Sequence, residues 1–103
     1  MSVFIHTVTL KAKPGRLADA RAEVARLAES AEANGASSVR LLASMAGDTS
    51  EGVLVMEFES GEAWATLMQS DIVREARRTR HEVDYPIVVT NTSVFQELDI
   101  NPD

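Results

Sequence analysis

The chain contains no cysteine, which excludes disulfide bonds, thiolate metal ligands and cysteine nucleophiles together. It also lacks any apolar run close to the roughly 20 residues that a membrane-spanning helix needs. Its first residues show no basic region followed by an apolar run and a small-residue cleavage site, the pattern that directs export. These absences predict a cytoplasmic protein.

Basic residues are few, because ten Lys and Arg stand against sixteen Asp and Glu and the formal net charge is −6. Nucleic acids and anionic membrane surfaces are bound through basic stripes or patches. Neither nucleic acid nor membrane is therefore expected as a partner. A length of 103 residues with 45% hydrophobic content is typical of one globular domain, which we place over residues 1–103.

Turn and cap residues divide the chain into six predicted elements. Pro14-Gly15 ends the first strand, Asn34-Gly35 offers a left-handed cap to the first helix, and Ser60 can cap the second. The elements are a strand over residues 3–12, a helix over 16–34, a strand pair over 37–46 and 51–60, a helix from 61 to near 81 that pauses at 69–71, and a strand over 86–100. The order β-α-β-β-α-β predicts an α+β ferredoxin-like sandwich, a four-stranded antiparallel sheet with two helices on one face.

Two features of the strands point beyond a simple sandwich. In the last strand the apolar parity shifts from Ile87 and Val89 to Val94, Leu98 and Ile100, which a bulge or a strand switch near residues 91–93 would explain. The strands also carry a second set of apolar residues, on the face that the helices would leave open: Val3, Ile5, Leu42, Val53 and Val55. Such a patch would drive association, so we predict a two-fold homodimer rather than a monomer with an apolar sheet face.

Three segments give the chain a family resemblance. They are LKAKPGR at residues 10–16, Asn34-Gly35, and EGVLVMEFESGEAWATLMQSDIVREARR at residues 51–78. In these the chain resembles the dimeric α/β-barrel superfamily, particularly its antibiotic-biosynthesis-monooxygenase-like and stress-responsive A/B-barrel-like branches. The resemblance implies two sheets forming a barrel, with a pocket in each subunit between sheet and helices or inside the barrel. Members include cofactor-independent oxygenases of polycyclic phenols, haem-degrading enzymes, polyketide cyclases and muconolactone-isomerase-like proteins.

His6 is the candidate catalytic residue. It stands eight residues before Pro14, where the related cyclase branch often carries a histidine that resembles a general base. A neutral imidazole suits that role because its ordinary pKa lies near operating pH. Those cyclases share a His in the second helix and a nearby Tyr, whereas the matching segment here, residues 67–73, reads LMQSDIV and contains neither. The alternative is a core histidine bonded to a backbone or hydroxyl group.

Four other residues are candidates for substrate binding: Arg40, Trp64, His81 and Tyr85. Arg40 could anchor a carboxylate or enolate, or pair with Glu57 on the adjacent strand. Trp64 could form a pocket wall or pack in the core, and His81 and Tyr85 could line a pocket mouth or merely end the helix. The cluster Arg74, Arg77, Arg78 and Arg80 is predicted to form a solvated face. No metal set has plausible spacing and nothing supports haem, so neither metal nor cofactor is expected.

Three functions remain in competition at this point. The first is a cofactor-independent monooxygenase-like enzyme that turns an aromatic or polyketide-type substrate into a carbanion that reacts with dioxygen. The second is a polyketide cyclase or isomerase, for which a second proton-transfer group should face His6. The third is a non-catalytic homodimeric module that binds a small apolar or aromatic ligand, for which the pocket should be aliphatic and His6 turned into the core.

Overall fold

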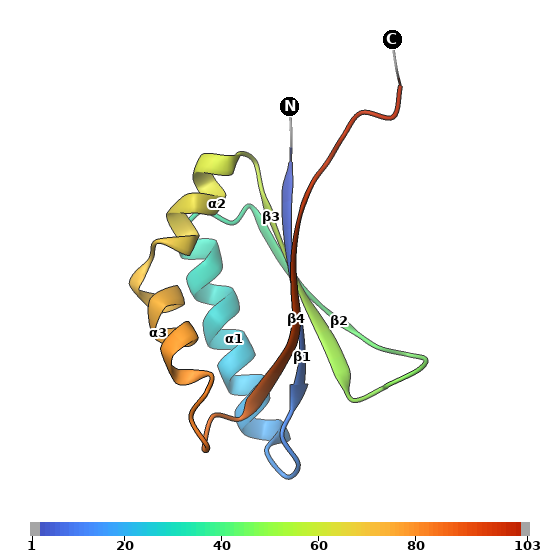
Figure 1. Cartoon of the computed structure of the whole chain (residues 1–103), viewed down its shortest axis with the longest axis vertical. Coiled ribbons are helices and arrows are strands. Elements are labelled where there is room, and N and C mark those ends of the chain that lie inside the picture. Colours follow the sequence, from blue (N-terminus) through green and yellow to red (C-terminus); the bar gives the residue numbers. More distant parts are fainter. Residues whose placement is uncertain (1–2, 102–103) are drawn as a thin grey trace.

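The computed structural model describes residues 3–101 and has the predicted ferredoxin-like α+β fold. Its elements are β1 (Phe4–Ala12), α1 (Leu17–Ala33), β2 (Ser38–Ala43), β3 (Glu51–Phe58), α2 (Gly61–Met68), α3 (Asp71–Thr79) and β4 (Ile87–Gln96). All neighbouring strands are antiparallel, in the order β2-β3-β1-β4. The helices lie together on one face of the sheet (Figure 1).

Most predicted boundaries agree with the structure to within two residues, and two strands end earlier than that. The pause in the second helix is a complete break, since α2 ends at Met68 and α3 begins at Asp71. Ser60 caps α2, its hydroxyl accepting a hydrogen bond from the Ala63 amide at 3.1 Å. The second strand ends at Ala43 rather than near residue 46, and the last strand ends at Gln96 rather than near residue 100.

The shift of parity in β4 comes from one extra residue. Thr9 of β1 pairs with Asn91, and Leu10 pairs with Val89, so Thr90 is left between the two registers. The irregularity therefore lies immediately before residues 91–93, where the sequence predicted a bulge. It turns Thr92 and Val94 to the same face as Val89 and Ile87, which keeps both halves of the strand facing the helices.

The core lies between the sheet and the helices. Phe58 and Ile87 are its largest fully buried side chains, and Leu54, Met56 and Leu67 are buried beside them. Because strand side chains alternate, the residues between these positions point to the opposite face of the sheet. Within residues 3–101, none of the helices combines the length and apolar character needed to cross a membrane.

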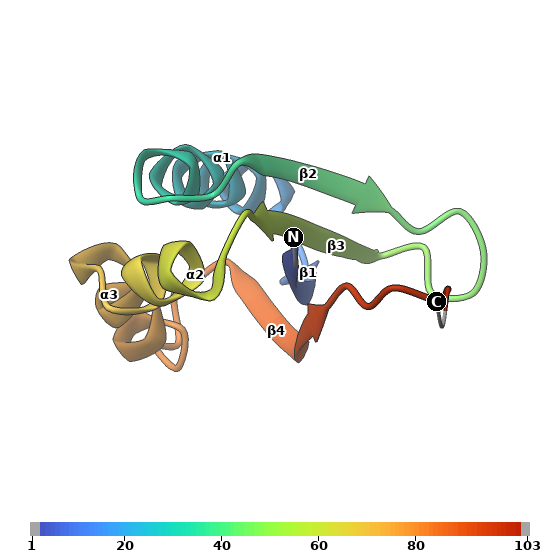
Figure 2. The ribbon, with the colours of Figure 1, turned by 90° about the horizontal axis from the view of Figure 1, so that it is seen from above.

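The face of the sheet away from the helices is partly apolar, as predicted. The registers place Ile5 beside Phe95 and Leu42 beside Val53 on this face. Leu42, Val88 and Phe95 are 49%, 44% and 55% exposed in the single chain. Figure 2 shows the hairpin of β2 and β3 projecting beyond the helical layer, which adds to this open surface.

Candidate ligand site between the sheet and the helices

A cavity of about 420 Å³ lies between the helix-facing side of the sheet and the helices. Its wall is mainly aliphatic and comes from β1, β3, β4 and all three helices. Representative members of this wall are Val8, Leu27, Leu54, Ile72, Val73 and Ile87. The volume is within the range of about 300–1,000 Å³ that is typical of small-molecule sites. The few polar groups that line it therefore decide what it can bind.

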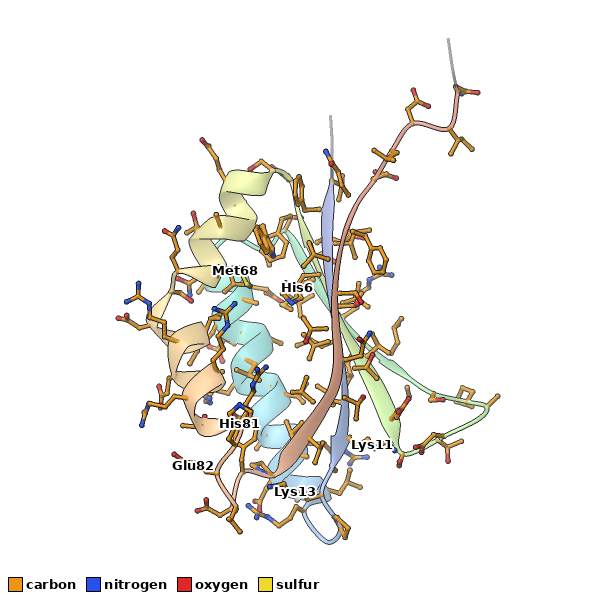
Figure 3. All side chains as sticks on the ribbon, viewed as in Figure 1. His6, Lys11, Lys13, Met68, His81 and Glu82 are labelled. Carbon is orange, nitrogen blue, oxygen red and sulfur yellow. The ribbon has the colours of Figure 1, made fainter. Side chains whose placement is uncertain are left out.

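His6 is buried at the wall of this cavity, with 7% of its surface exposed. It sits mid-strand in β1, between Met56 of β3 and Val94 of β4, so two strands hold its backbone. Figure 3 shows the ring between the sheet and the helical layer. Its Nδ1 accepts a hydrogen bond from the Trp64 indole nitrogen at 3.0 Å. His6 is thus both anchored and turned toward the cavity.

The contact with Trp64 assigns the tautomer of His6. An indole N–H can only donate, so Nδ1 must present a lone pair. In a neutral imidazole the proton then resides on Nε2, since the hydrogen bond that His6 makes within residues 3–101 uses Nδ1. The group that His6 offers to a ligand is therefore an N–H donor. A general base at Nε2, the role suggested by the resemblance, would need the other tautomer.

The surroundings of His6 keep its ring neutral. Burial lowers the pKa of His6 below its ordinary value of 6.5, and the positive charge of Arg77 lowers this pKa further. A charged imidazolium would also have to lose the Trp64 bond, since both ring nitrogens would then be donors. At neutral pH the cavity contains an uncharged hydrogen-bond donor.

Trp64 supports His6 without lining the cavity. It packs against the core from the first turns of α2, and its ring stacks on Phe4 with centroids 6.5 Å apart. Gly35 lies directly behind this part of α2: at φ +116°, a Cβ there would come within 2.9 Å of the Ala63 carbonyl oxygen. The close approach of the loop between α1 and β2 depends on glycine at this point, and it supports the helix that positions Trp64.

Tyr85 lines the cavity, but its hydroxyl is already engaged. Burial and a hydrogen bond to the Glu23 carboxylate both raise the pKa of Tyr85. Arg26 in turn holds Glu23 through two contacts, Nε to Oε1 at 2.7 Å and Nη2 to Oε2 at 2.9 Å. Tyr85 therefore contributes to the cavity wall, and the Glu23 carboxylate competes with any ligand for its hydroxyl proton.

Arg77 and Arg80 line the cavity, which sequence reasoning missed by assigning their cluster to a solvated face. Both side chains are exposed, so they stand at the opening of the cavity, whereas Arg74 and Arg78 are not part of its lining. The sequence did contain a signal for this placement, namely the helical spacing of the two arginines relative to apolar residues. Val73, Ala76, Arg77 and Arg80 follow the i, i+3, i+4, i+7 pattern of a single helix face.

The other candidate residues lie outside the lining of the cavity. Arg40 is on the far side of the sheet, where its Nη2 is 3.4 Å from Oε1 of Glu57; the pairing of these two residues was predicted. His81 is exposed beyond the end of α3 and accepts a contact from Arg80 at 3.4 Å. Within residues 3–101, no three His, Asp or Glu side chains gather closely enough to hold a metal ion.

The antibiotic biosynthesis monooxygenase family matches residues 3–79, from the strand that carries His6 to the end of α3. The chain belongs to this family. His6, Trp64 and Arg77 all lie within the segment that this monooxygenase family defines, whereas Arg80 and Tyr85 lie beyond it. None of the functionally curated proteins matches the chain.

Solved structures share the fold of this monooxygenase family member at low identity. Rv0793 from Mycobacterium tuberculosis is 22% identical, with a TM-score of 0.72 over 96% of this chain and 97% of that one. A candidate antibiotic biosynthesis monooxygenase from Bordetella bronchiseptica is also 22% identical, with a TM-score of 0.66 over 98% and 100%. Another candidate monooxygenase of this family, from Deinococcus radiodurans, is 15% identical and has a TM-score of 0.70. The match covers 94% of this chain and 91% of that one. At these identities the likeness concerns the fold.

Proposed function

We propose that the chain is a cofactor-independent monooxygenase that binds an aromatic or polyketide-type substrate in the cavity beside His6. One contact carries this assignment, the hydrogen bond from Trp64 to Nδ1 of His6, because it leaves an Nε2–H donor on a ring that lines a mainly apolar cavity. Membership of the antibiotic biosynthesis monooxygenase family supports the same class of reaction.

The chemistry fits a substrate with an acidic methylene that is next to a carbonyl or conjugated with one through aromatic rings. As the methylene loses a proton to water at the opening, charge develops on the carbonyl oxygen, and the Nε2–H of His6 stabilises it. The enolate carbon then adds dioxygen to form a hydroperoxide. Loss of the second methylene hydrogen together with the distal oxygen, as water, leaves a new carbonyl. Methylene and dioxygen thus give carbonyl and water, with no external reductant.

Oxygen uptake with anthrone tests this proposal, because anthrone has such a methylene and yields anthraquinone. We expect consumption above the buffer rate with equimolar quinone, and a loss of about a hundredfold or more in His6→Phe, which has no donor. His6→Gln should keep part of the activity, since its amide donates. The control is His81→Phe, at an exposed residue outside the cavity. Uptake equal to buffer, or equal in wild type and His6→Phe, overturns the proposal.

A non-catalytic binding module is the second candidate. The mainly aliphatic wall and the small number of polar groups favour it. The same assay separates the two, because a binding module would retain anthrone or anthraquinone without consuming oxygen. A cyclase or isomerase has less support, since the hydroxyl of Tyr85, the nearest candidate for a second proton-transfer group, is engaged by Glu23.

We further propose that the chain acts as a homodimer, with the open sheet faces of two copies packed together. Leu42, Val88 and Phe95 stand half exposed on that face. An isologous two-fold contact would cover these side chains on both copies. It would also enclose the Arg40–Glu57 pair, whose side chains are now 57% and 34% exposed.

A further inference from the structure

The polar groups around the cavity are all cationic or neutral. Those that line it are His6, Arg77, Arg80, Tyr85 and Thr92. Among the described residues 3–101, no carboxylate lines this cavity, although the chain as a whole carries sixteen acidic residues and a net charge of −6. A site with positive charge only, in an acidic protein, marks a local preference for negative ligands.

The two arginines at the opening keep their charge uncompensated. Within residues 3–101, neither Arg77 nor Arg80 lies within salt-bridge distance of a carboxylate. In the part of the chain that the structure describes, Arg77 donates to the sulfur of Met68, at 3.7 Å, which is a weak acceptor. Arg80 donates to a ring nitrogen of His81 at 3.4 Å. Most of the ten N–H donors of the two groups, roughly five each, are therefore free.

Arg77 in the last turn of α3 and Arg80 at its C-cap carry like charges three residues apart. The two charges repel each other, and a bound anion would relieve that repulsion. The acidic residues Glu75, Glu82 and Asp84 lie close by, but they line a separate hollow with Glu23 and Arg26. Negative charge is thus available in this region and is kept out of the cavity.

We propose that the natural ligand is an organic carboxylate, whose apolar body occupies the cavity while Arg77 and Arg80 hold its carboxylate at the opening. This inference rests on the proposed ligand cavity and names the class of its occupant. A guanidinium presents paired donors that match the two oxygens of a planar carboxylate. With the charge held at the opening, the opposite end of the ligand reaches the Nε2–H of His6.

Calorimetric titration of the full chain with 2-naphthoate and with 2-naphthamide, its uncharged isostere, tests the inference. Wild type should bind the carboxylate at least about tenfold more tightly than the amide, because charge-assisted hydrogen bonds are the stronger kind. In the double variant Arg77→Gln/Arg80→Gln the preference for the carboxylate should vanish. The variant should bind 2-naphthoate more weakly than wild type does, whereas its affinity for 2-naphthamide should stay the same. The control Arg74→Gln/Arg78→Gln removes the same charge from the same helix outside the cavity, and should keep the preference.

Three outcomes overturn the inference: equal affinity of wild type for both probes, no binding of either, or an equal loss in the control variant. The titration requires no turnover. If the preference holds while anthrone is not oxidised, the proposed reaction fails and the carboxylate site stands. If anthrone is oxidised while the preference is absent, the reaction stands and the ligand class is wrong.

Discussion

The indole nitrogen of Trp64 donates a hydrogen bond to Nδ1 of His6 across 3.0 Å, joining residues 58 positions apart in the chain. The bond links the first turns of α2 to the middle of β1. It determines which nitrogen of the histidine faces the cavity, and so whether the ring can donate or accept there. Trp64 is in this sense a positioning residue for His6.

Replacing Trp64 by Phe should allow the neutral ring of His6 to adopt both of its tautomers. Nitrogen-15 NMR at neutral pH should show the wild-type ring protonated on Nε2 alone, and the ring of Trp64→Phe exchanging between both tautomers. The unfolding free energy should fall by about 1–3 kcal/mol, because a buried Nδ1 loses its donor. Phe4→Leu, which changes the other side of Trp64 and leaves the bond, is the control. An Nδ1-protonated ring in wild type would contradict the assignment.

Stability should depend on pH through His6. Its folded pKa lies below the ordinary 6.5, so as pH falls through 6.5 the unfolded chain takes up a proton that the folded chain does not. The contribution of His6 to the free energy of unfolding is thus fully present above pH 6.5, and it is lost as pH falls toward the pKa of His6 in the folded chain. Urea unfolding over this window should show wild type losing more stability than His6→Gln. Identical pH dependence in both would contradict the lowered pKa.

Gly35→Ala should destabilise the fold far more than Gly15→Ala. Both glycines have positive φ, which costs a side chain about 1–2 kcal/mol. At Gly15 an added Cβ meets nothing within 4 Å, whereas at Gly35 it meets the backbone oxygen of Ala63 at 2.9 Å. We expect losses of about 1 and about 3 kcal/mol in urea unfolding. Equal losses would show that the loop yields without disturbing α2.

The open sheet face should hold two chains together. Sedimentation equilibrium at micromolar concentration should give a dimer for wild type and a monomer for Phe95→Glu, since a charge buried in an apolar contact is unfavourable. Val83→Glu is the matched control, because Val83 is 95% exposed in the loop before β4, away from that face. A monomeric wild type would refute the dimer, and dissociation of both variants would place the contact elsewhere.

Local sequence patterns predicted most of the fold. Alternation in the strands, the break at Pro14-Gly15 and the Ser60 cap act between residues near in sequence, so their effects can be predicted without knowledge of distant contacts. The ends of β2 and β4 were predicted less well, because strand ends depend on where a partner strand stops. Ala43 is the last residue of β2 to pair with β3, although apolar residues continue beyond it.

The candidate site was only half predictable. His6 was selected as the candidate catalytic residue from its residue type, its position and the family resemblance, and Tyr85 as a residue that lines a pocket mouth or ends the helix; both line the cavity. The sequence could not show that Trp64 would direct the ring, or that Arg77 and Arg80 would face the cavity while Arg74 and Arg78 would not. A helical spacing defines a face, but which face meets the sheet depends on how α3 packs after the break at Gln69-Ser70.

The sequence by itself determined the α+β architecture and the two-sided apolar sheet, since these follow from periodicity, and its residue chemistry made His6 the candidate catalytic residue. Only the tertiary structure decided what His6 can do. A histidine can accept or donate at either nitrogen, and the choice is made by the group that meets it in space. Here that group is Trp64, brought to β1 by the packing of α2, and the charge at the cavity mouth is set by the packing of α3 in the same way.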